Sequence, residues 1–179
     1  GRGVHYCAHC DGRFYKGDTV VVVGGGNSAA SDAIYLSQLA KKVILVHRRD
    51  ALRADDVLSA GVRSADNVEI MWNAVPAGYE IADGSLTGIR TVVGGDEKLI
   101  HCDAVFVSIG RQPATDFLVG KLDLDKNGYI VADETTETSV DGVFAAGDVR
   151  TKPLRQIVTA VADGAVAAHF AAEYIRKVF

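Results

Sequence analysis

The sequence has 179 residues, 48% of them hydrophobic and 23% charged, which is enough for one well-packed domain or for one domain and part of another. Its formal charge of -4 provides no basic field for a phosphate backbone, so the composition argues against nucleic-acid binding. No segment has the roughly 20 uninterrupted apolar residues that span a bilayer, and the most apolar one, 157–172, predicts a buried helix instead of a membrane span.

The first chemically informative segment is Cys7-Ala8-His9-Cys10. This cysteine spacing occurs in redox dithiols and in zinc sites, but zinc needs two further Cys or His ligands and no second closely spaced pair exists. We therefore predict a redox dithiol and no metal site. Asp11 follows directly, as a proton donor to a leaving thiolate or as a turn cap. His9 favours a thiolate when protonated or simply faces water.

A strand, a helix and a second strand follow the dithiol. Residues 19–23 are a continuous β-branched run, the pattern of a strand that is buried on both faces. Apolar residues then recur with near-helical spacing from Ala29 up to the basic pair Lys41 and Lys42, which suits the negative end of a helix. Residues 43–46 are a second buried strand. Together these elements predict a parallel βαβ unit with a right-handed crossover.

The turn between the first strand and the helix is rich in glycine. Such turns bring backbone N–H groups and the positive helix end onto a pyrophosphate, and the pattern here is G-x-G-x-x-A. A tight turn without a ligand is the alternative, but the flanking buried strand and helix favour a dinucleotide. The residues expected to contact it are Gly24, Gly25, Gly26, Asn27, Ser28 and Ala29.

Basic residues follow the second strand, about 20 residues beyond the glycines, where such folds place the adenosine ribose. An acidic residue at this position accepts a hydrogen bond from the 2′-hydroxyl of NAD. Here the residues are His47, Arg48 and Arg49, with Arg53 close behind. Guanidinium groups clamp a 2′-phosphate by charge-assisted hydrogen bonds, whereas a charge run elsewhere is usually a solvated face. This position favours NADPH.

The middle of the chain predicts a helix over about 54–64 and a strand over 68–71. After residue 71 the pattern changes to short runs separated by turns. Glycine-containing turns separate three short runs that predict an antiparallel insert, at 77–81, 86–93 and 98–102. Residues 104–109 return to the buried apolar type and predict a strand that rejoins the parallel sheet and ends at Gly110. The unpaired Cys102 is predicted to be a small buried hydrophobe.

A domain boundary is predicted at residue 111, because Pro113 and its neighbours interrupt the pattern. Beyond it, two short strands flank a turn at Asn127-Gly128, another strand covers 143–146, and one long helix covers 156–178. So few elements cannot easily enclose a core, which implies a further partner segment.

A flavin site is expected as well, because a nicotinamide usually reduces a disulfide through a flavin. The strand over 143–146 ends in Gly147-Asp148, whose carboxylate is suited to accept from a polyol. Arg155-Gln156 opens the last helix, whose N-terminal N–H groups can face the electron-rich edge of a flavin. Each feature alone is common in turns and on surfaces.

Taken together, these motifs resemble the low-molecular-weight, bacterial-type thioredoxin reductases. The resemblance covers nearly the whole chain and rests on Cys7-Ala8-His9-Cys10-Asp11-Gly12, the glycine turn, His47-Arg48-Arg49-Asp50 with Arg53, Gly142 to Asp148, and Arg155-Gln156. It implies an α/β fold: a Rossmann-like three-layer NADPH domain over residues 1–111, which carries the dithiol and the antiparallel insert, and the C-terminal part of an FAD domain over 112–179. The N-terminal FAD segment is expected to be absent.

The resemblance also implies a reaction. Electrons pass from NADPH through FAD to the disulfide and on to thioredoxin, with Cys10 beside the flavin, Cys7 attacking thioredoxin and Asp11 as proton donor. The further cofactor-binding residues implied are Gly110, Gly147, Asp148, Arg155, Gln156 and Ile157. We also expect a cytoplasmic homodimer when the protein is intact, and no activity from this chain alone.

Three points remain as hypotheses. Members of this family generally carry a small residue, typically Thr, at the position of His9, so we hypothesise that His9 stabilises a thiolate and makes the pair more oxidising. An unchanged potential of His9→Thr in a redox titration would refute this. The alternative functions are the reductase component of a peroxidase system and a non-catalytic NADPH-binding module.

Overall fold

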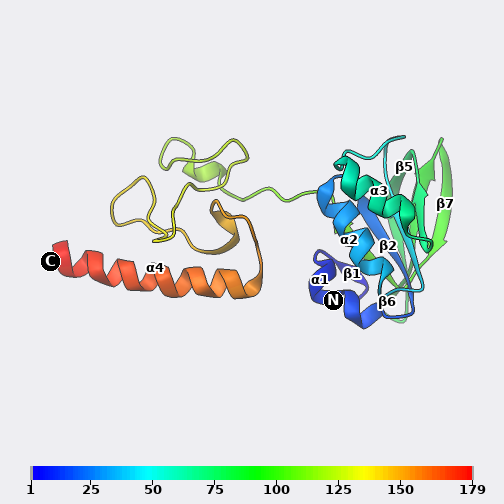
Figure 1. Ribbon diagram of the computed structural model, residues 1–179, viewed down its shortest axis with the longest axis horizontal. Coiled ribbons are helices and arrows are strands. Elements are labelled where there is room, and N and C mark those ends of the chain that lie inside the picture. Colours follow the sequence, from blue (N-terminus) through cyan, green and yellow to red (C-terminus); the bar gives the residue numbers. More distant parts are fainter. Residues whose placement is uncertain (1, 179) are drawn as a thin grey trace. The chain divides into compact units, whose positions relative to one another are not determined.

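The computed structural model describes residues 2–178, and the chain divides into two compact units, Gly1–Gly110 and Arg111–Phe179. The first unit is built on a five-stranded parallel sheet (Figure 1). In spatial order its strands are β1 (Val4–His5), β8 (Ala104–Ser108), β2 (Thr19–Gly24), β3 (Lys42–Val46) and β4 (Val68–Met71). The last strand along the chain therefore lies between β1 and β2, as expected for a strand that rejoins the sheet.

Two different layers cover the faces of this sheet (Figure 1). Helices α2 (Asn27–Ser37) and α3 (Asp56–Ser64) cover one face, and an antiparallel sheet covers the other, formed by β5 (Ala74–Ala82), β6 (Ser85–Val93) and β7 (Asp96–His101). Successive residues of β2 alternate between the two cores, so Val20 and Val22 face the helices while Val21 and Val23 face the antiparallel sheet. The prediction of a strand buried on both faces is confirmed.

The antiparallel insert forms as the sequence predicts, although β5 begins earlier than expected, at Ala74. Its first hairpin turns at Asp83 and Gly84, both with positive φ, 51° and 75°. A two-residue turn of this kind matches the twist of the flanking strands. Cys102 directly follows β7 and is buried in the core between the two sheets, so its predicted role as a small hydrophobe is confirmed.

The predicted end of α2 is wrong. The helix ends at Ser37, and the N–H groups of Leu39 and Ala40 both bond back to the Leu36 carbonyl, at 3.0 and 2.8 Å. The chain thus turns sharply before the basic pair is reached. Lys42 is already the first residue of β3 and pairs with Glu69 of β4 at 2.7 Å, so it does not cap the helix.

The second unit has little regular structure before its long helix. It contains two short 3₁₀ helices, η2 (Asp116–Leu118) and η3 (Gly147–Val149), and then α4 (Ile157–Val178). The strands predicted around Asn127-Gly128 and over 143–146 are wrong: the described residues there form only isolated bridges, between Leu124 and Ile130, Ile130 and Arg150, and Glu137 and Phe144. A continuous strand needs a neighbouring strand, and this unit provides none in the part of the chain described.

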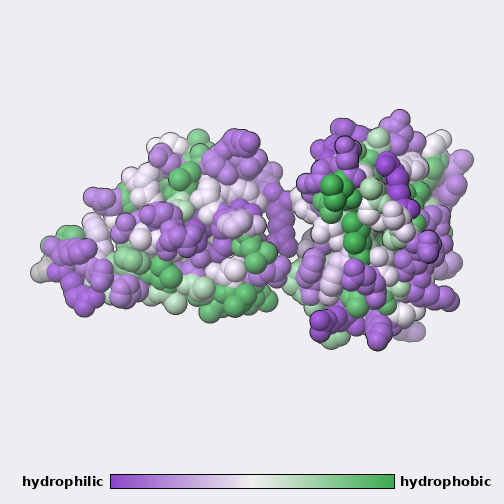
Figure 2. Space-filling model, viewed as in Figure 1, coloured by the Kyte–Doolittle hydropathy of each residue, from purple (hydrophilic) through white to green (hydrophobic). Residues whose placement is uncertain are grey.

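Helix α4 is present as predicted, but its predicted burial is wrong. Its first turns expose Ile157, Val158 and Val161 at 80%, 72% and 67%, and Asp163 is the buried residue of this helix. Figure 2 shows the resulting apolar surface, in green, along α4. An apolar helix is buried only where another layer packs on it, and the loops of this unit cover one side alone. Over residues 2–178, no helix combines the length and apolarity that a membrane span requires.

Candidate functional site

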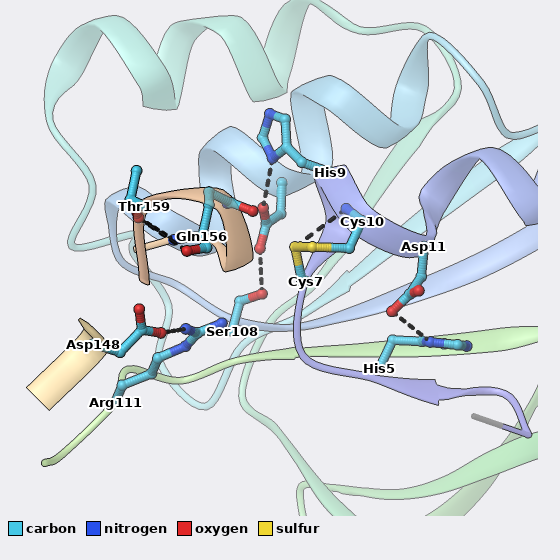
Figure 3. The surroundings of a disulfide bond; sticks show 11 residues. His5, Cys7, His9, Cys10, Asp11, Ser108, Arg111, Asp148, Gln156 and Thr159 are labelled. Atoms are coloured by element: carbon cyan, nitrogen blue, oxygen red, sulfur yellow. Dashed lines mark hydrogen bonds and ion pairs between the residues drawn. A yellow bond between two sulfur atoms is a disulfide. The ribbon is translucent and has the colours of Figure 1, made fainter. Parts of the chain in front are cut away.

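The two cysteines form a disulfide just beyond the carboxyl end of β1. The Cys7 and Cys10 sulfurs are bonded at 2.03 Å, and Cys7 occupies the N-cap of the short helix α1 (Ala8–Asp11). Its sulfur accepts a hydrogen bond of 3.1 Å from the Cys10 N–H (Figure 3). The two sulfurs are thus bonded to each other, and residues 2–178 contain no cluster of three or more His, Cys, Asp and Glu side chains suited to a metal ion.

Asp11 ends α1, and its carboxylate points toward the ring of His5 from β1 (Figure 3). The His5 Nδ1 lies 3.0 Å from Asp11 Oδ2, and its Nε2 lies 2.7 Å from the hydroxyl of Tyr15. Tyr15 belongs to η1 (Gly12–Tyr15), the 3₁₀ helix that continues α1. Burial, followed by the charge of Asp11, raises the pKa of Tyr15, so its hydroxyl stays protonated at neutral pH.

His9 lies on the side of the dithiol that faces α2. Its ring stacks on the ring of Tyr35, with centroids 4.3 Å apart, and its Nδ1 lies 4.0 Å from Asp32 Oδ1. The second oxygen of Asp32 accepts a 2.5 Å hydrogen bond from the Ser108 hydroxyl at the end of β8. The Asp32 carboxylate therefore faces the His9 ring and joins it to the end of β8.

The first two positions of the glycine turn between β2 and α2 leave no room for a side chain. A Cβ atom on Gly24 would lie 2.4 Å from the Ser108 carbonyl oxygen, and one on Gly25 would lie 2.1 Å from the His47 ring. Gly26, in contrast, faces open space and is the N-cap of α2 without a side-chain capping bond. The N–H groups of the first turn of α2 are consequently available to an anion.

The basic segment after β3 is tied directly to this turn. The Arg53 N–H donates to the Gly25 carbonyl at 2.7 Å, and Asn27 and Asp55 exchange hydrogen bonds of 2.9 and 3.1 Å. The His47 ring is buried and its Nε2 lies 3.0 Å from the Ala51 carbonyl oxygen. Two segments separated in sequence are thereby held in one arrangement, because each fixes the backbone of the other.

A cavity of about 620 Å³ opens over the carboxyl ends of the parallel strands. Of the residues expected to contact a dinucleotide, those that line it are Gly24, Gly25, Gly26, Asn27, Ser28, His47, Arg48, Arg53 and Gly110. Ala29 is fully buried beneath the turn, and Arg49 is exposed but does not line the cavity. The arrangement can hold an extended anionic ligand, with its phosphates at the start of α2 and a further phosphate at the two lining arginines.

The antiparallel insert also contributes to this cavity, which its sequence does not predict. Ala74, Val75, Pro76 and Tyr79 of β5 line it opposite the glycine turn. These residue types carry no signal of ligand binding in the sequence. Only the packing of the two sheets against each other brings β5 to the cavity.

In the second unit, a buried ionic cluster holds the Gly147-Asp148 turn. Asp163 of α4 accepts from the Gly147 N–H at 2.9 Å, from Nε and Nη2 of Arg150 at 2.8 Å each, and from Lys152 Nζ at 2.7 Å. The Arg150 hydrogen bonds are the main cause that lowers the pKa of Asp163, against the opposing effect of burial. Gly147 has a φ of 82°, a conformation that glycine adopts without strain.

The remaining predicted residues of this unit lie around η3 and the start of α4. Asp148 is in η3, not at the end of a strand, and its carboxylate accepts from Arg111 Nη1 at 3.4 Å (Figure 3). Arg155 donates from Nε to the Asp148 carbonyl at 3.1 Å, and its guanidinium lies 3.8 Å from the centre of the Tyr129 ring. Gln156 directly precedes α4, and Ile157 is its exposed first residue.

Comparison with known proteins agrees with these features. Residues 1–164 match the family model described as pyridine nucleotide-disulphide oxidoreductase. The chain is 44% identical to a thioredoxin reductase of Treponema pallidum and 42% identical to one of Bacillus subtilis, over 98% and 99% of its own length. It spans only 57% of the length of each of these relatives.

Solved structures agree as well. The crystal structure of thioredoxin reductase from Streptococcus pyogenes matches 98% of this chain with a TM-score of 0.92 and 40% sequence identity, and the match covers 58% of that protein. The expected resemblance to thioredoxin reductases and the expected α/β fold are thus confirmed. The chain belongs to the pyridine nucleotide-disulphide oxidoreductase family.

Proposed function

We propose that this chain belongs to a flavin-dependent disulfide reductase that passes electrons from NADPH, through FAD and the Cys7–Cys10 disulfide, to thioredoxin or a thioredoxin-like protein. The observation that carries the proposal is the presence, in one folded unit, of a formed disulfide and a dinucleotide-type glycine turn. The thioredoxin reductases named above support the choice of the protein substrate.

In this proposal, residues 1–111 form the NADPH-binding domain. The cavity, the unblocked start of α2 and the two lining arginines fit a dinucleotide with a 2′-phosphate. The N–H groups at Gly26 and beyond bind the pyrophosphate, while Arg48 and Arg53 bind the 2′-phosphate. The hydrogen bond from the Arg53 N–H to the Gly25 carbonyl holds the arginine segment at a fixed position beside the glycine turn.

The preference for NADPH is expected to depend on Arg48 and Arg53 and not on Arg49. Each charge-assisted hydrogen bond contributes roughly 1.5–3 kcal/mol, so Arg48→Ala or Arg53→Ala is expected to weaken NADPH binding by roughly 10- to 100-fold. Binding of NADH, which lacks the 2′-phosphate, should change little. Arg49→Ala is the matched control, because it removes the same charge from a residue that does not line the cavity.

Titration of nucleotide fluorescence with each variant of the chain measures these affinities. Equal losses for Arg48→Ala and Arg49→Ala would show that only the general positive field attracts the nucleotide. A parallel loss of NADH affinity would show that the two lining arginines do not recognise the 2′-phosphate.

Residues 112–179 supply part of an FAD site in this proposal. The Gly147-Asp148 turn, positioned by Asp163, would hold the polyol, and Arg155, Gln156 and Ile157, at and just before the first residue of α4, would hold the flavin. When bound, the flavin carries two electrons from the nicotinamide to the disulfide. The apolar first turns of α4 remain exposed in this chain, which supports a site completed by further protein.

At the dithiol, the proposed roles are distinct. Reduction gives the disulfide two electrons and breaks the bond between Cys7 and Cys10. Cys7 then attacks the disulfide of thioredoxin, and Cys10 attacks the resulting mixed disulfide, which restores the internal bond and releases the thioredoxin dithiol. Asp11 supplies the proton that neutralises a departing thiolate. We propose that the intact protein acts as a homodimer in the cytoplasm.

NADPH-dependent reduction of thioredoxin tests the function. A protein that joins this chain to an N-terminal flavin segment is expected to oxidise NADPH when thioredoxin is added, and Cys10→Ser is expected to abolish that reaction. The 179-residue chain alone is expected to bind NADPH without turnover. If the joined protein, once loaded with flavin, does not reduce thioredoxin, the proposed substrate is rejected. Activity with a peroxidase instead would establish the alternative function, the reductase component of a peroxidase system.

A further inference from the structure

The proposed proton donor, Asp11, is bonded to a histidine that is itself buried. The His5 ring is only 8% exposed, and its Nδ1 lies 3.0 Å from Asp11 Oδ2 while its Nε2 lies 2.7 Å from the Tyr15 hydroxyl. Both ring nitrogens therefore have partners, and both partners belong to the segment that follows the dithiol. Figure 3 shows the carboxylate turned toward the ring.

Packing holds the His5 ring in this orientation. It lies 5.2 Å from the ring of Phe106 at an interplanar angle of 27°, and it meets the ring of Tyr15 edge-on at 5.1 Å. Phe106 is fully buried in β8 and pairs in register with His5 of β1. Moving the ring out of this position would leave a cavity beside Phe106, so packing keeps Nδ1 directed toward Asp11.

The ring can bond to Asp11 in either proton state of the carboxyl group. A carboxylate only accepts, so Nδ1–H donates to it and Nε2 accepts from the Tyr15 hydroxyl. A carboxyl group that carries its proton on Oδ1 still accepts at Oδ2 from the same Nδ1–H, and the contact of Nε2 with Tyr15 is unchanged. Burial, then the charges of Asp11, Asp18 and Asp103, raise the pKa of Tyr15, so its hydroxyl can act as donor or acceptor throughout.

We propose that His5 is a positioning residue that orients Asp11 and keeps it hydrogen-bonded before and after it gives up its proton in thiol–disulfide exchange. The inference rests on the role proposed above for Asp11. When an external thiolate attacks the disulfide, one new S–S bond forms, the Cys7–Cys10 bond breaks, and the departing sulfur takes the bonding electron pair. The proton of Asp11, carried on the oxygen that does not face His5, neutralises that sulfur, and the His5 Nδ1–H donates to Asp11 Oδ2 before and after the transfer, so the ring keeps one tautomer.

Two amide substitutions separate the two contacts of the ring. The amide of Asn at position 5 reaches about as far as Nδ1, so it can donate to or accept from Asp11 but does not reach Tyr15. The amide of Gln reaches about as far as Nε2, so it retains the Tyr15 contact and loses Asp11. Phe at position 5 preserves the ring stacking on Phe106 and loses both contacts.

The test follows reduction of the disulfide in the 179-residue chain by dithiothreitol at one fixed pH, without nucleotide or flavin. Asp11→Asn is expected to slow the reaction by about 100-fold, as for loss of a general acid. His5→Gln and His5→Phe are expected to slow it by about tenfold or more, and His5→Asn by less than about threefold. In the Asp11→Asn background, His5→Gln is expected to have no further effect.

The outcomes separate the inference from the function on which it rests. A wild-type rate for Asp11→Asn removes the acid role of Asp11 and the inference with it, whereas NADPH-dependent reduction of thioredoxin is decided by its own assay. A slow Asp11→Asn with wild-type rates for all His5 variants overturns the inference alone. Two further results would show that His5 only supports the fold, and each would overturn the inference. One is that His5→Gln slows the reaction equally in the wild-type and Asp11→Asn backgrounds. The other is that His5→Asn and His5→Gln slow it equally.

Discussion

Asp163→Asn is expected to destabilise the second unit by about 3–5 kcal/mol, the usual cost of breaking a buried ion pair from one side. The side chains of Asp163, Arg150 and Lys152 are 9%, 7% and 6% exposed, so the substitution leaves two buried cations without their counter-ion. It also weakens the bond that holds the Gly147 N–H. Amide hydrogen exchange of Gly147 and of α4 measures the loss in the full chain.

The matched control is Asp148→Asn, at the residue next to Gly147 in η3 of the same unit. Its carboxylate is 47% exposed and pairs with an exposed Arg111, so the loss is expected to be below about 1 kcal/mol. Because the pKa of Asp163 is lowered in the folded protein, its contribution is fully present above the unfolded value, about 3.9, and is lost as the pH falls below it. A difference between wild type and Asp163→Asn that persisted unchanged at pH 2 would contradict the ionic explanation.

Gly25→Ala is expected to destabilise the first unit by about 2–3 kcal/mol and to impair nucleotide binding. The added Cβ would lie 2.1 Å from the His47 ring, which is buried and bonded to the Ala51 carbonyl. Since the ring has little room to move, the glycine turn must shift, and the N–H groups at the start of α2 shift with it. Chemical denaturation followed by Trp72 fluorescence and titration with NADPH measure the two effects.

Gly26→Ala is the control for stability, because its Cβ would meet no atom within 4 Å and its φ is -96°. It is expected to unfold at nearly the wild-type denaturant concentration. A further variant tests the stated cause: in a His47→Ala background, Gly25→Ala should cost much less, because the clashing ring is gone. An undiminished cost there would place the strain elsewhere in the turn.

Local patterns in the sequence were sufficient to predict most of the first unit. Its strands β2, β3 and β8 are short apolar runs, and their burial in the sheet follows from composition alone. The glycine turn could be found for the same reason, since its conformation and its role depend on neighbouring residues. The end of α2 was misplaced because the decisive contacts, from Leu39 and Ala40 back to Leu36, leave no mark in the hydrophobic pattern.

The second unit was predicted less well because its order comes from individual side chains. Asp163 lies in an apolar helix, and the sequence gives no reason to pair it with Arg150, Lys152 and the Gly147 N–H. The short apolar runs there resemble strands, yet they have no neighbouring strand with which to pair in residues 111–178. A pattern along the chain cannot show whether a partner layer is present.

The sequence by itself determined the local features on which the proposed chemistry rests: a dithiol, a glycine turn after a buried strand, and arginines after the second buried strand. Each feature is local, because the residues that form it are close together in the sequence. Only the tertiary structure decided that Arg48 and Arg53 line the cavity and Arg49 does not, that β5 lines it too, and that Tyr15 bonds to His5, which bonds to Asp11. Those contacts depend on strand register and sheet packing, which long-range burial determines.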